Sequence, residues 1–194
     1  MIIFAQKLAM RNYLLLFLFI MPFRGFSQTM IEGVSMPNQL KVAGQNILLN
    51  GGGVREKYFL DLYVAGLYLK APSSDAAKII AADEPMAIRI HIVSGLITSE
   101  KMTAAVDEGF KKSAGSTLSS LQTRINQFKD VFKEEIKKGD VYDLIYEPGK
   151  GCLIMKNNKL TTSISGLDFK KGLFGIWLCN DPAQESLKSA MLKK

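Results

Sequence analysis

Apolar and polar residues alternate or run together in several short segments that predict β-strands. In residues 86–93, isoleucines alternate with polar side chains, which predicts a strand with one face in the core. Residues 40–43 and 47–49 flank a Gly-Gln-Asn turn and predict a hairpin. Residues 54–69 are rich in β-branched and aromatic side chains and are interpreted as one long strand. Near the C-terminus, short turns separate three further apolar runs, which predict an antiparallel meander over residues 142–146, 152–155 and 160–164.

Other segments have apolar residues at steps of three and four, the spacing of a helix with one buried face. The predicted helices cover residues 76–82, 99–114, 118–138, 167–178 and 182–192. Asp75 and Ser99 are expected to cap the first two, and Gly139 is expected to end the third. Asp181 is expected to cap the last helix, with Gln184 placed for a capping box. Strands and helices therefore come in blocks, which predicts an α+β fold, an antiparallel sheet with a helical layer on one face.

The first 27 residues have the order of a signal peptide. Basic Lys7 and Arg11 precede an apolar run of nine residues, and small residues follow before Gln28. That run is short compared with the roughly 20 residues that a membrane span needs, so cleavage is favoured over an uncleaved anchor. We therefore expect a signal peptide over residues 1–27 and one domain over 28–194. The mature form is expected not to span a membrane, and to be exported to the periplasm or the extracellular space.

Composition and charge narrow the function classes. Apolar residues make up 47% of the chain and charged residues 22%, values that are typical of a globular domain. Without residues 1–27 the formal net charge falls from +7 to +4, and the remaining lysines are scattered along the chain. A solvated surface is therefore favoured over a nucleic-acid partner.

The residue types that hold metals or act as nucleophiles are scarce. His91 is the only histidine and lies within a predicted strand, so a zinc site or a Ser-His-Asp triad is hard to assemble. Cys152 and Cys179 could pair in an oxidising compartment, but their apolar contexts favour two buried thiols. The sequence implies no metal or redox cofactor.

The segment from Gly51 to Leu69 is the most unusual in the chain. Three glycines open it and are interpreted as a bend between strands, because a phosphate-binding loop would precede a helix. Charged residues follow at the start of an otherwise apolar and aromatic strand. Alternation along one strand places Arg55 and Tyr63 on the same face.

Three short motifs resemble the chalcone isomerase family, in particular its bacterial chalcone isomerase-like branch. They are Gly-Val-Arg-Glu-Lys at 53–57, Tyr-Val-Ala-Gly-Leu-Tyr-Leu at 63–69 and Gly-Leu-Phe-Gly-Ile-Trp-Leu at 172–178. The resemblance covers about residues 33–193. It implies an open-faced β-sandwich, with helices over a large antiparallel sheet and a cleft between the two layers.

The resemblance also implies site residues. In plant chalcone isomerases an Arg of the first motif helps to cyclise a chalcone, whereas in fatty-acid-binding relatives the same Arg and a Tyr hold a carboxylate. These positions fall on Arg55 and Tyr63. The enzymes have Thr where this chain has Tyr63, which favours the binding branch. Lys57 is a further ligand-binding candidate at the mouth of the cleft, and Tyr68 is a weaker one that is expected to pack against the helices.

We therefore expect an exported, non-catalytic binder of a fatty-acid-like or other apolar carboxylate, or of a polyphenol-like ligand. A guanidinium fits a carboxylate with two parallel hydrogen bonds, and a phenol adds a further donor. One alternative is an intramolecular lyase with Arg55 as its catalytic residue, and another is a module that binds an envelope protein. A purely structural alternative pairs Arg55 with Glu56, Asp61 or a helix carboxylate and packs Tyr63 in the core.

Overall fold

The structure is a computed structural model that describes residues 28–194, and the predicted signal peptide lies outside the described residues. The strands are β1 (Gln28–Ile31), β2 (Val34–Pro37), β3 (Gln39–Val42), β4 (Gln45–Lys57), β5 (Leu60–Leu69), β6 (Met86–Ile92), β7 (Val141–Glu147), β8 (Gly151–Lys156) and β9 (Lys159–Ile164). The helices are α1 (Ala76–Ala81), α2 (Ser99–Ala114), α3 (Leu118–Lys129), α4 (Leu167–Leu178) and α5 (Glu185–Leu192).

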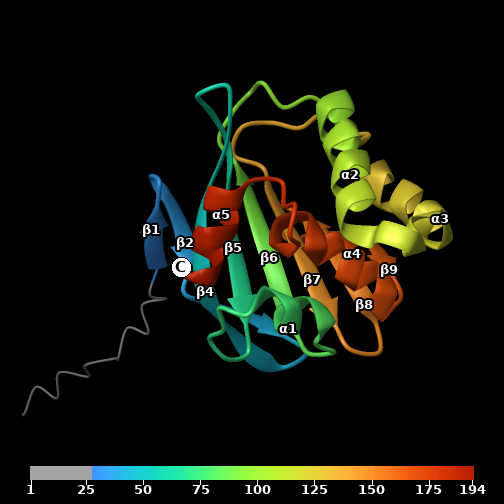
Figure 1. The fold of residues 1–194 in the computed structure, drawn as a ribbon. Helices are drawn as coiled ribbons and strands as arrows, with labels where there is room; N and C mark the ends of the chain where they lie inside the picture. Colours follow the sequence, from blue (N-terminus) through green and yellow to red (C-terminus); the bar gives the residue numbers. More distant parts are fainter. Residues whose placement is uncertain (1–27) are drawn as a thin grey trace, which may run out of the picture.

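Strands β3 to β9 form one seven-stranded sheet in which every strand pairs antiparallel with its neighbour in the sequence. The helices cover one face of this sheet (Figure 1). The β1–β2 hairpin forms a separate two-stranded sheet, and its Val34 and Met36 pack with Val64 of β5 on the other face. The predicted α+β architecture, an antiparallel sheet with a helical layer, is therefore confirmed.

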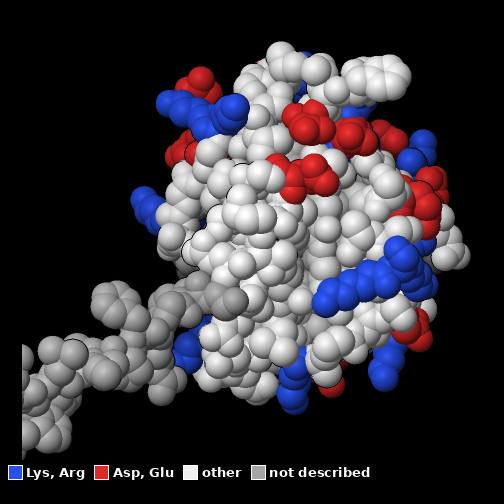
Figure 2. Space-filling model, turned by 90° about the vertical axis from the view of Figure 1, so that its left-hand side faces the viewer, with Lys and Arg blue, Asp and Glu red and all other residues white. Residues whose placement is uncertain are grey.

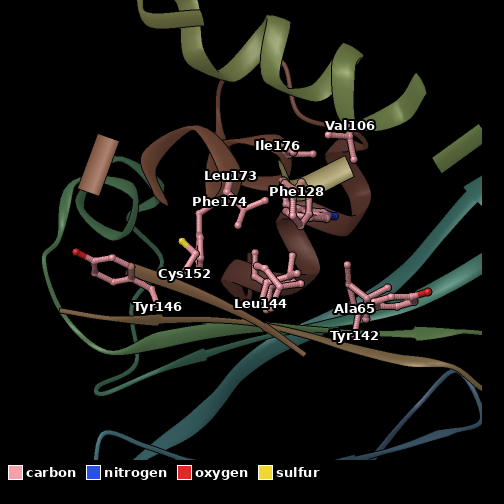
Figure 3. Close-up of a cluster of buried hydrophobic side chains, with 14 of the residues drawn as sticks. Ala65, Val106, Phe128, Tyr142, Leu144, Tyr146, Cys152, Leu173, Phe174 and Ile176 are labelled. Atoms are coloured by element: carbon pink, nitrogen blue, oxygen red, sulfur yellow. The ribbon is translucent and has the colours of Figure 1, made fainter. Parts of the chain in front are cut away.

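The main core lies between the inner face of the sheet and the helices (Figure 3). On β6, the three isoleucines point into this core, as the alternation predicts. Arg89 and His91 lie on the outer face, where the Arg89 guanidinium makes two hydrogen bonds to the Asp143 carboxylate, of 2.7 and 2.9 Å. His91 is thus a half-buried side chain away from the helical layer.

Two predictions for the segment 51–69 are wrong. Residues 54–69 are not one strand, because β4 ends at Lys57, β5 begins at Leu60, and Tyr58 and Phe59 form a two-residue turn. The three glycines are not a bend, because they lie within β4 and pair with residues 65–67 of β5. Antiparallel pairing makes Arg55 and Tyr63 direct partners across the two strands, so they still share a face.

The helix boundaries differ from prediction at three places. Helix α3 ends at Lys129 and continues as a short 3-10 turn, so the predicted helix to residue 138 is too long, although its apolar side chains remain buried. Helix α2 is capped by Thr98 rather than Ser99. Helix α5 begins at Glu185, so Gln184 is at the N-cap position and forms no capping box. The β1–β2 hairpin was not predicted from the sequence.

Helix α5 lies directly on the backbone of β4. A Cβ atom on Gly51 would meet the carbonyl oxygens of Ala190 and Met191, the first at 2.3 Å, and one on Gly53 would meet the Ala190 methyl at 2.9 Å. The buried Asn50 amide donates to the Met191 carbonyl, with a nitrogen-to-oxygen distance of 2.8 Å. The glycine run therefore serves close helix-on-strand packing.

A buried lysine holds α1 in place. Lys170 of α4 is fully buried, and its ammonium donates to the carbonyl oxygens of Ile79, Ile80 and Ala82 at 2.8–3.0 Å. Burial lowers the pKa of Lys170 to about 8. All three carbonyls lie at or near the C-terminal end of α1, where the helix itself offers no N–H partner. The Lys170 ammonium therefore satisfies them.

Both cysteines are free, and they differ in burial. Cys152 is buried on the inner face, where burial raises the pKa of its thiol to about 12, while Cys179 at the end of α4 is partly exposed. The prediction of two unpaired thiols is confirmed, and the prediction that both are buried is confirmed only for Cys152. Among residues 28–194, no helix has the length and apolar character needed to cross a membrane.

The contact between α5 and β4 predicts that substitution of two glycines by alanine changes the stability of the protein by very different amounts. We expect Gly51→Ala to lower the free energy of unfolding by about 2–3 kcal/mol, because the methyl would overlap backbone oxygens that cannot rotate away. Gly95→Ala is the matched control, since a methyl there meets no atom within 4 Å, and its effect should stay within about 0.5 kcal/mol. Urea denaturation of both variants measures this, and equal stabilities would contradict the proposed close packing.

Candidate ligand-binding site

A cavity of about 420 Å³ opens between the sheet and the helices, at the end of the sheet where β4 turns into β5. This volume is within the range of small-molecule sites. Most of its wall is apolar, contributed by β5, β6, the loop after β6, α2, the α3 region and α4. The apolar lining residues are Leu60, Leu62, Ile90, Leu96, Ile97, Met102, Ala104, Ala105, Val106, Phe128, Phe132, Ile176 and Ala183.

Charged side chains around the cavity are mostly cationic. Arg55, Lys57, Lys101 and Lys112 line it, against one carboxylate, that of Glu108. Lys112 is paired with Glu108 at 3.2 Å and with an Asp181 oxygen at 3.3 Å, so the other three carry the excess positive charge. Arg55 and Lys57 lie together at the end of β4, so this end of the cavity is cationic. An apolar cavity with a cationic end favours a ligand with an apolar body and an anionic group.

Arg55 and Tyr63 meet at this cationic end. They are partners in the β4–β5 ladder, and both line the cavity. A register shift next to them leaves Leu62 as an extra residue on β5, so that Leu62 and Tyr63 both line the cavity although they are neighbours in sequence. Such a bulge redirects side chains next to a site.

Tyr63 is arranged to donate a hydrogen bond to a ligand. Its hydroxyl oxygen accepts from the Trp177 indole N–H, with a nitrogen-to-oxygen distance of 3.0 Å. Burial raises the pKa of the Tyr63 phenol above its ordinary value, although the Trp177 hydrogen bond and the charge of Arg55 act in the opposite direction. The phenol therefore keeps its proton at neutral pH, and that proton is available to an acceptor in the cavity.

Gln184 holds Arg55 in position. Its side-chain oxygen accepts from Arg55 Nη1 at 2.8 Å and from the Glu56 backbone N–H at 2.9 Å. Arg55 Nη1 also donates to the Glu56 carbonyl at 2.5 Å. These two bonds use two of the five guanidinium N–H groups, and a third interacts with the Tyr63 hydroxyl, which leaves two N–H groups to meet a ligand. Within residues 28–194 no carboxylate lies within ion-pair distance of Arg55, so the salt bridge of the purely structural alternative is not formed.

The other two predicted ligand-binding residues lie in different places. Lys57 lines the cavity next to the turn, as expected for a residue at its mouth. Tyr68 does not line the cavity and does not pack against the helices, so that prediction is wrong. It is fully buried on the outer face with Val42 and Ile47, and its hydroxyl donates to the Pro37 carbonyl at 2.9 Å. Tyr68 lies an even number of residues from Leu60 and Leu62, which line the cavity, so simple alternation would place all three on the same face. The extra residue at the register shift beside Tyr63 puts Tyr68 on the opposite face.

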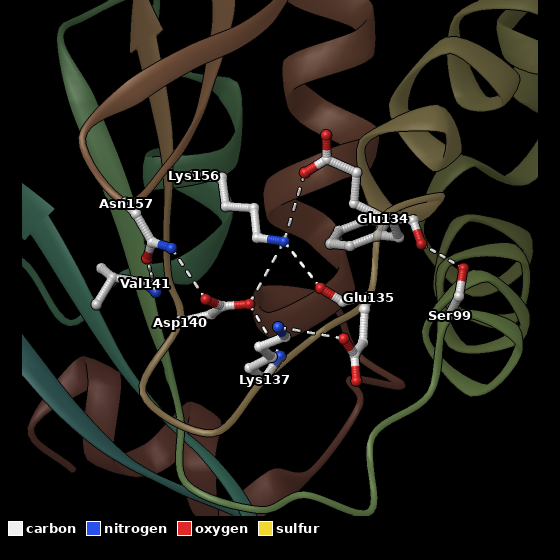
Figure 4. A network of polar contacts seen from close by, with 9 residues as sticks. Ser99, Glu134, Glu135, Lys137, Asp140, Val141, Lys156 and Asn157 are labelled. Carbon is white, nitrogen blue, oxygen red and sulfur yellow. Dashed lines mark hydrogen bonds and ion pairs between the residues drawn. The ribbon is translucent and has the colours of Figure 1, made fainter.

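A second hollow, of about 650 Å³, lies beside the turn between β8 and β9 and is lined mainly by charged residues. Its groups satisfy one another (Figure 4): Lys156 pairs with Asp140 at 3.4 Å and donates to the Glu135 carbonyl at 3.0 Å. Asp140 also accepts from the Asn157 amide. Among the described residues, no group of three or more histidine, cysteine or acidic side chains could hold a metal ion.

The surface shown in Figure 2 carries basic side chains spread among acidic ones, and the acidic ones gather over its upper half. Nucleic-acid-binding proteins present a continuous basic patch or stripe. This face therefore offers no such footprint.

The architecture is that of the chalcone isomerase fold, and a solved structure of a fatty-acid binding protein from Arabidopsis thaliana superposes with a TM-score of 0.70. The two proteins are 19% identical, and the match covers 86% of this chain and 96% of the other. Residues 28–193 match the chalcone isomerase-like family, and the chain belongs to that family. A search of curated proteins found no match.

Sequence reasoning missed two residues that shape the polar end. Trp177 lies within a motif that carries the family resemblance, but nothing in the sequence pairs it with Tyr63, 114 positions away. Gln184 was assigned to a capping box, whereas its side chain binds Arg55. No sequence signal marks Gln184, because Pro182 favours a helix that begins at residue 182, whereas α5 begins at Glu185.

The Tyr58–Phe59 turn predicts an unusual stability effect. Both residues have positive φ, 51° and 64°, a conformation for which two-residue hairpin turns normally use Asn and Gly. We expect the double substitution Tyr58→Asn, Phe59→Gly to raise the free energy of unfolding by about 1 kcal/mol, because it relieves left-handed backbone in bulky residues. Chemical denaturation measures this. A loss of stability would show that the two rings contribute to the fold.

Proposed function

We propose that the protein binds an apolar carboxylate of the fatty-acid type without transforming it. The observation that carries the proposal is the pair Arg55 and Tyr63 at the cationic end of an apolar cavity. The carboxylate would accept from the free guanidinium N–H groups and from the Tyr63 hydroxyl. The hydrocarbon tail would extend between the sheet and α2, toward Val106, Phe128 and Ile176.

Three features support this ligand class. Gln184 and Trp177 hold the two donors in place through bonds that are complete without a ligand, so little side-chain freedom is lost when a ligand binds. The apolar wall gains from contact with a hydrocarbon chain. The structurally similar Arabidopsis protein is described as a fatty-acid binding protein, and we propose that this chain shares that class of ligand.

The head-group contact is tested by comparing an acid with an alcohol of the same chain length. We expect Arg55→Ala to weaken binding of palmitic acid about 10- to 100-fold in titration calorimetry, since hydrogen bonds to a charged group contribute about 1.5–3 kcal/mol. Tyr63→Phe should weaken it about fivefold, by the loss of one neutral donor. Hexadecanol has the same tail without the charge, and its affinity should hardly change in Arg55→Ala.

Two results would contradict the proposal. Equal affinities of wild type and Arg55→Ala for the acid would remove the head-group contact. Enhanced cyclisation of a chalcone above the rate in buffer, abolished by Arg55→Ala, would instead favour the lyase alternative. We expect no enhancement, because Tyr63 replaces the Thr of the plant enzymes.

We also propose that the protein acts outside the cytoplasm, on the basis of the basic, apolar and small-residue order of residues 1–27. Expression of the full chain in a bacterium with a Sec system, followed by N-terminal sequencing of the envelope fraction, should give a mature protein that begins at Gln28. Replacing Leu14, Leu15 and Leu16 with aspartate should keep the chain in the cytoplasm, because it destroys the apolar region. Retention of residues 1–27 on exported protein would indicate an anchor.

A further inference from the structure

The turn between β4 and β5 presents a cluster of exposed apolar side chains at the mouth of the cavity. Tyr58 is 83% exposed, Phe59 is fully exposed, and Leu60 is 48% exposed. Leu96, in the loop after β6, is 51% exposed and lines the same cavity. Figure 1 shows the turn and this loop projecting at the same end of the sheet. We refer to these four residues as the apolar tip.

The tip is distinct from the other exposed apolar residues of the described chain, which are Met30, Leu48 and Leu160. Those three lie on three different strands, as is normal for a soluble surface. Four of the seven large exposed apolar side chains in residues 28–194 therefore gather at one place. That place is also where Arg55 and Lys57 line the cavity.

We propose that the apolar tip docks on the surface of a lipid bilayer that carries anionic head groups, and so places the cavity mouth against the membrane. The inference goes beyond the proposed function, and it can be tested without any ligand. Two features favour a lipid surface over a protein partner. One is the shape and chemistry of the apolar tip, and the other is the positive charge of the side chains on its cavity side.

The tip is convex and amphipathic. A two-residue turn at the end of a hairpin projects from the molecule, so it can enter a fluid apolar phase, whereas a protein partner would need a matching pocket. Tyrosine favours the membrane interface, where its apolar ring and its polar hydroxyl are both accommodated, and phenylalanine and leucine enter the acyl boundary beneath it. Tyr58 and Phe59 occupy the two positions of the turn that project furthest.

Charge complementarity supports an anionic surface. Lys57 lies next to the turn, and Lys101 lies close to Leu96, whose carbonyl accepts from its ammonium at 2.9 Å. The two carboxylates near the turn, those of Glu56 and Asp61, are partners across the hairpin and do not line the cavity. The cavity side of the tip thus carries the basic groups that are attracted to anionic lipid.

The backbone of the turn gives an independent reason to look for a function here. Tyr58 and Phe59 have left-handed φ values that Asn and Gly adopt far more readily. The Phe59 ring is fully exposed, so burial within the chain does not compensate for this conformation. Bulky side chains held in a strained and exposed turn are typical of a contact site.

Vesicle co-sedimentation of residues 28–194 tests the proposal. We expect binding to vesicles of phosphatidylcholine with 30% phosphatidylglycerol, and at least about tenfold weaker binding for Phe59→Ser, because a buried aromatic ring is lost from the interface. Phe59 does not line the cavity, so the palmitic acid affinity of this variant should stay unchanged. Phe59→Trp should restore or strengthen vesicle binding.

Leu48→Ser is the matched control. Leu48 is 44% exposed and lies on the same strand as Lys57, nine residues away, a separation of roughly 30 Å at ~3.3 Å per residue. We expect this variant to bind vesicles like the wild type. Binding to pure phosphatidylcholine vesicles should be clearly weaker than to the anionic ones.

The inference would be overturned if the wild type did not bind the anionic vesicles, or if it bound both vesicle types equally. It would also be overturned if Phe59→Ser bound vesicles as well as the wild type, or if Leu48→Ser lost as much binding as Phe59→Ser. Sedimentation velocity, which measures the oligomeric state, could give one further contradicting outcome. If the wild type forms dimers that Phe59→Ser abolishes, and does not bind vesicles, the tip binds a second copy of the chain instead. Failure of vesicle binding would leave the palmitic acid result unaffected, so the two proposals are tested separately.

Discussion

Helix α5 rests on the bare backbone of Gly51 and Gly53, and this contact sets the geometry of the ligand-binding end of the molecule. Because strand and helix run antiparallel here, residues 51 and 53 meet the end of α5, and Arg55 meets Gln184 at its start. A side chain on either glycine would lift the helix and separate Gln184 from Arg55. The orientation of the guanidinium therefore depends on two residues that have no side chain.

The cavity lies beside a well-packed core rather than within a loose one. On α2, the wall residues Ala104 and Ala105 are small, so the helix leaves space above the sheet where larger side chains would fill it. Closer to α4, Gly109 allows a tight contact with Ile176. Polar donors at one end and hydrocarbon over the rest match an amphiphilic molecule better than a uniformly polar one.

Alternation of apolar residues predicted β3 and β6 to β9, because these strands have one face in the core and mostly short turns between them. The β4–β5 turn escaped prediction because Tyr58 and Phe59 lack the glycine or asparagine that marks such turns. Arg55 and Tyr63 still share a face, because the extra residue Leu62 makes them direct partners across the two strands. Their partners, Gln184 and Trp177, could not be predicted, because only the folded chain brings residues more than 110 positions away to this site.

Trp177 is the only tryptophan in the sequence, and it lines the cavity with its indole N–H bonded to Tyr63. The tryptophan fluorescence of the protein thus comes from the site itself. A molecule that enters the cavity would change both the polarity around the indole and the hydrogen bond of its N–H group. The natural chain therefore carries its own optical probe of occupancy, without any label or substitution.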